Sequence, residues 1–438
     1  MTAELVAAGL SGTVVNVSVT VAVAAIAASF DASIATAAAT VVMLNVAMAF
    51  TMPLAGVWAA RLGPRRLIVT AGVLVFASSV LLSLSPNLVV LAIARAAQGA
   101  ALAAVVPVSV QASGQLLAGP ARSRALGWWG ASNGLGLAFA PLVGGAIVDL
   151  AGWRWVTIPS CLLGLALVIT AGRAFPAGLH TGSTIRLRGL GIVALVSGAG
   201  MSALAAASAR QWALAAALAV ACAIGSIAAA RAMRAGGDLA ELRVWSRDRE
   251  VRRSSLGATL QMVANGLVQV AVPAWLIVTG VLGAGGAAIV LMGMTLTMAA
   301  MGPITGRRSI DYPDRLRRGL AGCAAGLVGL AIAAAAGPWW IAAPALVVLG
   351  LGAGSLLSPS LTAFSNTLAG SSTVALSLFN LARLGSFGLG GLLGGAAVDA
   401  GRPGAAFLAV ALVCGAAAVG VAARRVADRG GTQRGTNR

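Results

Sequence analysis

The sequence contains no lysine and few charged residues of any kind. Of its 438 residues, 9% are charged and only 11 are acidic, so its positive charge comes from arginine alone. A phosphate-binding GxxxxGK[ST] loop needs a lysine, and its absence argues against an ATP-driven pump. The low charge also excludes an ordinary soluble domain, because water would then face apolar surface on nearly every side.

Cysteine and histidine are scarce as well. The single histidine, His180, lies in a polar stretch without a neighbour for catalysis or metal binding. The four cysteines fall inside apolar runs and form no CxxC pair, so we expect small core residues and neither disulfides nor a metal site. They are Cys161, Cys222, Cys323 and Cys414.

Clusters of catalytic residue types are missing too. A membrane enzyme would need acidic, histidine or serine side chains gathered at one membrane face. The sequence offers no such cluster, and we therefore expect no enzyme, no catalytic residue, no metal and no cofactor.

What the chain does have is long apolar runs. Hydrophobic residues make up 59% of it, and the mean hydropathy is +0.94. A helix crosses a bilayer in about 20 residues, and these runs do not alternate in polarity as membrane strands do. The sequence predicts an all-α polytopic membrane protein with about 14 spans on this ruler. We place them at 8–30, 36–59, 66–85, 89–111, 126–148, 155–173, 188–206, 211–230, 254–280, 285–306, 317–336, 338–362, 372–395 and 404–423.

The arginines predict how these spans are oriented. Loops on one side collect 25 arginines, and loops on the other side hold only Arg154, Arg210 and Arg402. Cytoplasmic loops carry such an excess, so we expect a multi-pass protein of the cell inner membrane with both termini in the cytoplasm. The N-terminus lacks a basic region ahead of its first apolar run, and no cleavable signal peptide is expected. Because the arginines form short clusters and no continuous polar face, nucleic acid is not an expected partner.

One helix occurs twice. Residues 125–149 read ALGWWGASNGLGLAFAPLVGGAIVD, and residues 375–399, placed 250 positions later, read ALSLFNLARLGSFGLGGLLGGAAVD. Repeated halves that meet around a central site are how many secondary transporters are built. We expect an N-terminal six-helix bundle at 1–173, an inserted helix pair at 186–231, a C-terminal six-helix bundle at 251–424 and a disordered cytoplasmic tail at 425–438.

Three motifs carry a resemblance to a known family. Residues 56–66 read GVWAARLGPRR, residues 91–99 read LAIARAAQG, and the repeated helix carries spaced small residues followed by the WRW of 153–155. On these motifs the chain resembles the fourteen-helix drug:proton antiporter branch of the major facilitator superfamily. The resemblance implies two six-helix bundles with two inserted helices. It also implies conformational roles for Gly56, Arg61, Gly63, Arg65, Arg66, Gly136, Pro141, Gly144 and Gly145.

The acidic residues depart from this family. Its members usually carry aspartates at the positions of Ser11 and Ala60, and none of the 11 acidic residues here falls near the middle of an expected span. Proton antiport normally uses an intramembrane carboxylate, so we expect weak or absent proton coupling. Asp149 and Asp399 are the nearest candidates as proton carriers, and their alternative role is that of polar caps at the membrane interface.

Two arginines fall inside expected spans, where an unpaired charge is costly. Arg95 could clamp the first, second and fourth helices together, or it could attract an anionic substrate. Arg383 occupies the position equivalent to Asn133 in the repeat, and it could face a cavity, snorkel to the interface or pack against neighbours.

Polar amides complete the set of candidate substrate residues. Gln261, Asn265 and Gln269 recur every four residues, so they share one helical stripe that either lines a cavity or bonds to a neighbouring helix. The candidate substrate and cavity residues are Asn16, Asn45, Arg95, Gln98, Asn133, Gln261, Asn265, Gln269, Asn380 and Arg383.

Together these features favour a secondary active transporter that exports hydrophobic or amphipathic small molecules by alternating access, as in drug or natural-product efflux and multidrug resistance. The two intramembrane arginines favour an anionic compound. The alternative is a transport-inactive binding or scaffold protein of the same fold, suggested by the missing acids. The expected partners are the small-molecule substrate and the lipid bilayer, and the involvement of a coupling proton stays open.

Overall fold

A computed structural model describes residues 1–117, 119–176, 178, 212–235, 248–307, 312–337, 339–367 and 373–435, with short helical stretches between 194 and 206. All regular structure in these residues is helical, which confirms the predicted all-α class. Eleven of the described helical segments are long and apolar enough to cross a membrane. The chain is therefore a multi-pass membrane protein.

The N-terminal half contains α1 through α7. The helices are α1 (Thr2–Val17), η1 (Thr20–Ala22), α2 (Val23–Ser29), α3 (Ile34–Leu62), α4 (Pro64–Ser83), α5 (Leu88–Leu116), α6 (Gly119–Ala151), η2 (Trp153–Thr157) and α7 (Ile158–Ala174). The span expected at 8–30 is thus one helical column that is interrupted by a short 3-10 turn.

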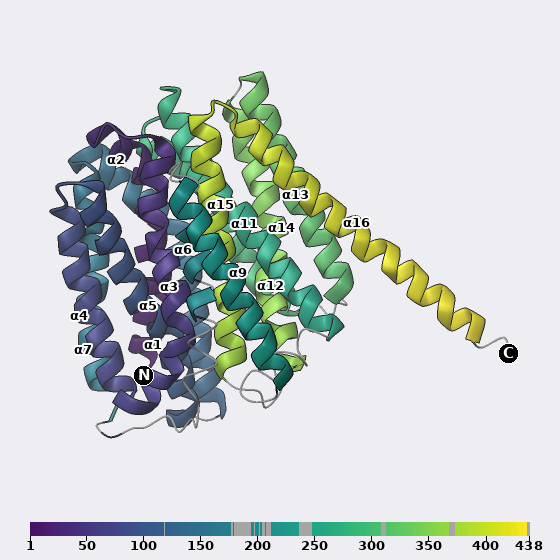
Figure 1. Ribbon diagram of the computed structural model, residues 1–438, viewed down its shortest axis with the longest axis horizontal. Coiled ribbons are helices and arrows are strands. Elements are labelled where there is room, and N and C mark those ends of the chain that lie inside the picture. The colour runs from purple at the N-terminus through teal and green to yellow at the C-terminus, as the bar shows by residue number, and fades with distance from the viewer. Residues whose placement is uncertain are drawn as a thin grey trace.

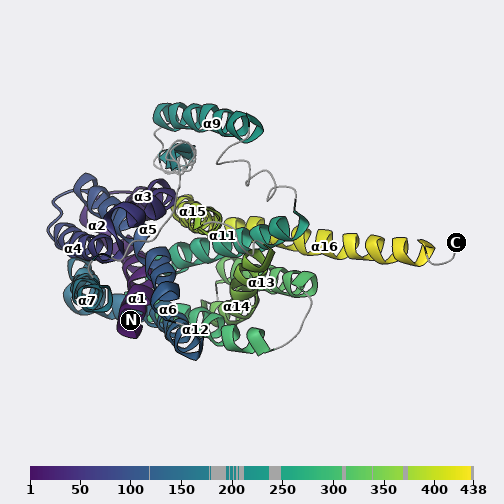
Figure 2. The ribbon, with the colours of Figure 1, turned by 90° about the horizontal axis from the view of Figure 1, so that it is seen from below.

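The C-terminal half contains α11 through α16, and α9 stands between the halves. The helices are α9 (Trp212–Ala235), α11 (Arg249–Val278), α12 (Ala284–Arg307), α13 (Tyr312–Ala336), η3 (Trp339–Ile341), α14 (Ala342–Thr367), α15 (Thr373–Asp399) and α16 (Pro403–Gly435). Figure 2 shows α9 to one side of both halves. Of the expected spans, the one at 188–206 lies largely outside the described residues.

Local sequence sets the helix ends. The Ser33 hydroxyl accepts a hydrogen bond from the Thr36 amide at the start of α3, and the Asn87 side chain accepts one from Val90 at the start of α5. Gly63 ends α3 with a φ of 77°, which a residue with a Cβ rarely adopts, and Pro64 then begins α4. Consecutive helices that are joined by short turns run antiparallel to each other, and they form two bundles (Figure 1).

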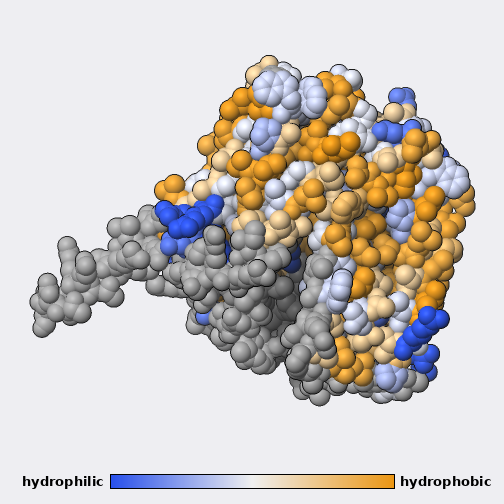
Figure 3. All heavy atoms as spheres, turned by 180° about the vertical axis from the view of Figure 1, so that it is seen from behind, coloured by the Kyte–Doolittle hydropathy of each residue, from blue (hydrophilic) through white to orange (hydrophobic). Residues whose placement is uncertain are grey.

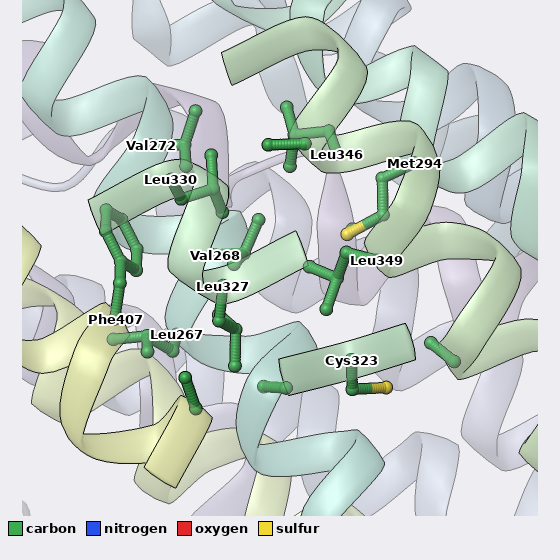
Figure 4. Close-up of a cluster of buried hydrophobic side chains, with 14 of the residues drawn as sticks. Leu267, Val268, Val272, Met294, Cys323, Leu327, Leu330, Leu346, Leu349 and Phe407 are labelled. Atoms are coloured by element: carbon green, nitrogen blue, oxygen red, sulfur yellow. The ribbon is translucent and has the colours of Figure 1, made fainter. Parts of the chain in front are cut away.

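The C-terminal half has a continuous apolar core (Figure 4). Side chains from α11, α12, α13, α14 and α16 converge there, and most of them are fully buried. The labelled members are Leu267, Val268, Val272, Met294, Cys323, Leu327, Leu330, Leu346, Leu349 and Phe407. Cys323 and Cys414 belong to this core as small buried residues.

The outer surface is apolar. Figure 3 shows hydrophobic residues over much of the face that it presents, and large side chains such as Val73, Leu162 and Leu412 are more than half exposed. A water-soluble protein rarely carries apolar patches of this size. We conclude that lipid covers these helix faces.

The end of the chain differs from the sequence prediction. We expected residues 425–438 to be disordered, but α16 continues to Gly435, and Figure 1 shows it extending away from the bundles. A helix that has already begun adds each further residue at little cost, and arginine and alanine, which follow the apolar part of α16, favour helix. The prediction of a disordered tail was therefore wrong for residues 425–435.

Candidate functional site

Arg95 lies at the junction of three helices of the N-terminal half. From α5, its guanidinium donates hydrogen bonds to the carbonyl of Val15 at 2.8 Å, of Asn16 at 3.3 Å and of Val41 at 3.1 Å. The first two carbonyls belong to α1 and the third to α3, so the side chain joins the first, second and fourth helices. This is the position that the clamp alternative requires.

The rest of the Arg95 environment is also closed. Its Nη1 donates to the Gln98 side chain at 2.9 Å, and the Gln98 amide donates to the Ser79 hydroxyl of α4 at 2.8 Å. Arg95, Gln98 and Ser79 are all fully buried. A guanidinium has five N–H donors, and backbone carbonyls and Gln98 already engage both Nη atoms and Nε. The geometry favours a structural role over anion binding.

Asn16 and Asn45 lie beside this clamp. The Asn16 side-chain amide donates to the Asn45 carbonyl oxygen at 3.4 Å, which links α1 to α3. Both residues are buried, and the Asn16 carbonyl oxygen of the side chain has no hydrogen-bond partner. Ser11, at the position where the family carries an acid, is buried with its hydroxyl donating to Ala8 of its own helix at 3.0 Å.

The amide stripe of α11 is buried. Gln269 donates to the Asn265 side chain at 2.7 Å, while the Gln261 amide faces the sulfur of Met298 on α12 at 3.8 Å. The side-chain oxygens of Gln261 and Gln269 have no partner. A buried acceptor without a donor destabilises a fold by about 1–3 kcal/mol. The C-terminal half therefore holds acceptor capacity that its own side chains do not use.

The remaining candidates are more open or fall outside the description. Asn133 on α6 and Arg383 on α15 are both half-buried, and the Arg383 guanidinium carbon lies 5.9 Å from the centre of the Phe379 ring. The side chains of Asn380 and Ala60 lie outside the description, and so do the surroundings of Gly56. The structure thus does not bring all ten candidates into one site.

Glu4 is a buried residue that the sequence analysis did not single out. This residue is on α1, its carboxylate accepts a hydrogen bond from the Ser109 hydroxyl at 2.7 Å, and its second oxygen has no partner. Among the acidic residues whose side chains the structure describes, Glu4 alone is buried. We expected the first span to begin at residue 8, and starting the helix one turn earlier would have revealed Glu4.

The small residues of the repeated helix lie where helices contact one another. A Cβ on Gly144 would lie 2.6 Å from the Ser18 carbonyl within its own half, and a Cβ on Gly145 would lie 2.6 Å from the Ala284 carbonyl of the other half. Gly136 packs against Thr13 of α1, and Pro141 is buried within α6. Arg61, at the end of α3, and Arg65 and Arg66, at the start of α4, are exposed at the opposite end of the bundle.

The repeated helix also places a carboxylate across the boundary between the halves. Asp149, near the end of α6, accepts hydrogen bonds from the amides of Ala284 at 3.0 Å and Gly285 at 2.6 Å. Asp399, at the end of α15, accepts hydrogen bonds from the amides of Ile34 at 2.7 Å and Ala35 at 2.6 Å. Both carboxylates are exposed and accept hydrogen bonds from amides at the start of a helix. This arrangement matches the polar caps that the sequence offered as their alternative role.

No group of three or more metal-binding side chains occurs in the part of the chain that the structure describes. The arrangement therefore consists of a closed polar clamp in one half, a buried amide stripe in the other, and contacts between small residues where the halves meet.

Comparison with known proteins identifies similar sequences. The family profile described as Major Facilitator Superfamily matches residues 5–387. The multidrug transporter protein MdtP of Bacillus subtilis is 33% identical over 132 residues, which is 30% of this chain and 24% of that protein. A multidrug resistance protein B homolog of Mycobacterium tuberculosis is 33% identical over 151 residues, 34% of this chain and 28% of that protein.

A third similar protein is the puromycin resistance protein pur8 of Streptomyces alboniger. It is 34% identical over 125 residues, which is 28% of this chain and 25% of that protein. The matched segments span less than a third of the length of each of these relatives. The similarity therefore concerns a part of each relative.

Proposed function

The chain belongs to the major facilitator superfamily, and from this membership we propose that it exports hydrophobic or amphipathic small molecules, such as drugs or natural products, by alternating access. The observation that carries the proposal is the buried amide stripe of α11, where Gln261 and Gln269 each keep an unused acceptor oxygen. A buried polar group inside a membrane bundle marks a substrate path more often than a lipid contact. The names of the similar proteins, which include multidrug and puromycin resistance, support the same substrate class.

The proposed substrate presents hydrogen-bond donors. Among the residues that the structure describes, buried amide oxygens without a partner belong to Asn16 in one half and to Gln261 and Gln269 in the other. A ligand with N–H or O–H groups on an apolar body satisfies such acceptors, while its body packs against side chains such as Met298. This refines the expectation of an anionic substrate, because the guanidinium of Arg95 is engaged by backbone carbonyls.

The proposed orientation has both termini in the cytoplasm of a cell whose plasma membrane the chain spans. It is supported by the exposed arginines 61, 65 and 66 at the end opposite Asp149 and Asp399. The end with the two aspartates is then the outer end. We place no enzymatic step in this function.

Proton coupling is proposed to be weak or absent. The exposed positions of Asp149 and Asp399 support this, because a carboxylate that stays in contact with water on one side does not carry a proton across. Glu4 is the one described carboxylate that could serve instead, since it is buried and half-satisfied. A coupled protein would use this residue.

The test is export by the full chain in proteoliposomes. Amphipathic compounds of similar size, with and without hydrogen-bond donor groups, would each be placed on one side of the membrane to impose a substrate gradient. We expect the donor-bearing compounds to leave proteoliposomes faster than they leave liposomes without protein. For analogues whose donors are methylated, the difference between the two rates should be smaller. Binding of these compounds without any export would contradict transport and favour the scaffold alternative.

A further inference from the structure

The contacts of Asp149 and Asp399 are related by the internal repeat. Asp399 lies 250 positions after Asp149, and the amides that it accepts, those of Ile34 and Ala35, lie 250 positions before Ala284 and Gly285. Each half thus offers its carboxylate to the other half and receives one in return. Two contacts that obey the same offset are a feature of the fold and not an accident of one loop.

Each carboxylate meets amides that their own helix leaves unsatisfied. The first amides of a helix have no acceptor within it, and they carry a partial positive charge. At the start of α12 the capping position is Gly283, which has no side chain to offer. At the start of α3 the hydroxyl of Ser33 serves only Thr36. The aspartate of the opposite half supplies the acceptor in both places.

Small residues bring the halves close enough for these bonds. A Cβ on Gly145 would lie 2.9 Å from the Ala288 Cβ of α12, and a Cβ on Gly395 would lie 2.8 Å from the Ala38 Cβ of α3. A Cβ on Gly285 would lie 2.6 Å from the Asp149 carboxylate itself. The hydrogen bonds therefore depend on the close packing of α6 against α12 and of α15 against α3, because larger residues at these glycines would hold each pair of helices apart.

We propose that Asp149 and Asp399 are positioning residues of alternating access, and that together they form a twin lock that keeps the outer end closed and releases at both points in a single movement. The twin lock comprises Asp149 with the first amides of α12 and Asp399 with the first amides of α3. The role in a transport cycle rests on the proposed function, whereas the closed contact itself does not. To open this end, α6 must leave α12 and α15 must leave α3, so all four bonds break together.

Amide hydrogen exchange of the full chain, followed by mass spectrometry without substrate or ion gradient, tests the twin lock. The variants Asp149→Asn and Asp399→Asn each keep the shape of the side chain and remove its charge. Asp31→Asn is the matched control, because Asp31 is exposed at the same end of the molecule. The peptides to follow begin after residue 31 and cover 32–42 at the start of α3, and 279–290 at the start of α12.

We expect each single variant to accelerate exchange about fivefold in both peptides, since a charged group at a helix start contributes about 1 kcal/mol and the opening is shared. The double variant multiplies the two effects, and Asp31→Asn leaves both peptides unchanged. Gly285→Ala, which displaces the Asp149 carboxylate while keeping its charge, should likewise accelerate exchange in both peptides.

Acceleration confined to the peptide whose own amides lose the carboxylate would overturn the proposal, because each aspartate would then be a local helix cap. Unchanged exchange in both peptides would overturn it as well. If the unaltered protein exported no compound, but each aspartate variant accelerated exchange in both peptides, the twin lock would stand and only the proposed function would be contradicted. The two ideas are therefore separated by the same protein samples.

Discussion

The two halves share a repeat but use their buried polar groups in different ways. In the N-terminal half, the guanidinium of Arg95 bonds to two helices through their backbone carbonyls and, through Gln98, reaches a third at Ser79. In the C-terminal half, the core is apolar and its amide stripe leaves the oxygens of Gln261 and Gln269 without donors. The polar groups of the Arg95 clamp are therefore engaged in structure, although Asn16 and Glu4 of the same half each keep one oxygen without a partner, whereas the α11 stripe leaves two amide oxygens of one helix unpaired.

This difference assigns different roles to the halves. Satisfied buried networks rigidify a helix bundle, because each group depends on its partners. Unsatisfied acceptors cost free energy until a ligand or water reaches them. We therefore regard the helices joined by the Arg95 clamp as the rigid part of the molecule, and the α11 stripe as the part that responds to substrate.

The largest loss of stability is expected when Arg95 is replaced. Arg95→Leu leaves the carbonyls of Val15, Asn16 and Val41 buried and without this donor, so the free energy of unfolding should fall by at least about 3 kcal/mol. Arg95→Lys should recover only part of the loss, because an ammonium has three donors and no planar fork. Thermal unfolding of purified protein measures both. Equal stability of Arg95→Leu and the unaltered protein would contradict the clamp.

A second effect is expected where the halves pack through small residues. Gly144→Leu and Gly145→Leu should each lower stability by about 1–3 kcal/mol through overpacking and should reduce export. A Cβ at Gly144 would meet the Ser18 carbonyl of its own half, whereas a Cβ at Gly145 would meet the Ala284 carbonyl of the other half. Gly420→Leu is the control, because a Cβ there has nothing within 4 Å. Normal export by both α6 variants would show that this helix face points to lipid.

A smaller effect separates the two kinds of amide. Gln98→Leu removes the link between Arg95 and Ser79 and should lower stability by about 1–2 kcal/mol. Gln269→Leu removes an oxygen that has no partner and only one hydrogen bond, that to Asn265, so its loss of stability should be smaller, about 1 kcal/mol. Denaturation of the two variants under identical conditions provides the comparison. A larger loss for Gln269→Leu would reverse the assignment of roles.

Much of the fold could be predicted from the sequence because the apolar runs are long. The membrane class, most of the span positions and the junction of the first, second and fourth helices at Arg95 all follow from span length and charge. Glu4 was missed because the first span was placed at 8–30, which left the residues before it outside the membrane. The partners of Asp149 and Asp399 could not be predicted, since they are backbone amides, and those of Asp399 lie 365 and 364 residues away.

The smallest expected effect concerns coupling to protons. Glu4→Gln keeps the hydrogen-bonding shape of the side chain but does not titrate, so export driven by the substrate gradient should change less than twofold if coupling is weak. Rates measured with and without an imposed pH gradient, for the unaltered protein and the variant, decide the matter. A pH gradient that strongly accelerates export in the unaltered protein and has no effect in Glu4→Gln would identify Glu4 as the proton carrier.

The central claim is that the α11 stripe contacts the substrate while the Arg95 clamp does not. The most direct measurement is the dissociation constant of one donor-bearing exported compound, determined by equilibrium binding to the unaltered protein, Gln261→Leu, Gln269→Leu and Gln98→Leu. We predict about fivefold to tenfold weaker binding for each stripe variant, the equivalent of one lost hydrogen bond, and unchanged binding for Gln98→Leu. Unchanged binding in both stripe variants would contradict the account.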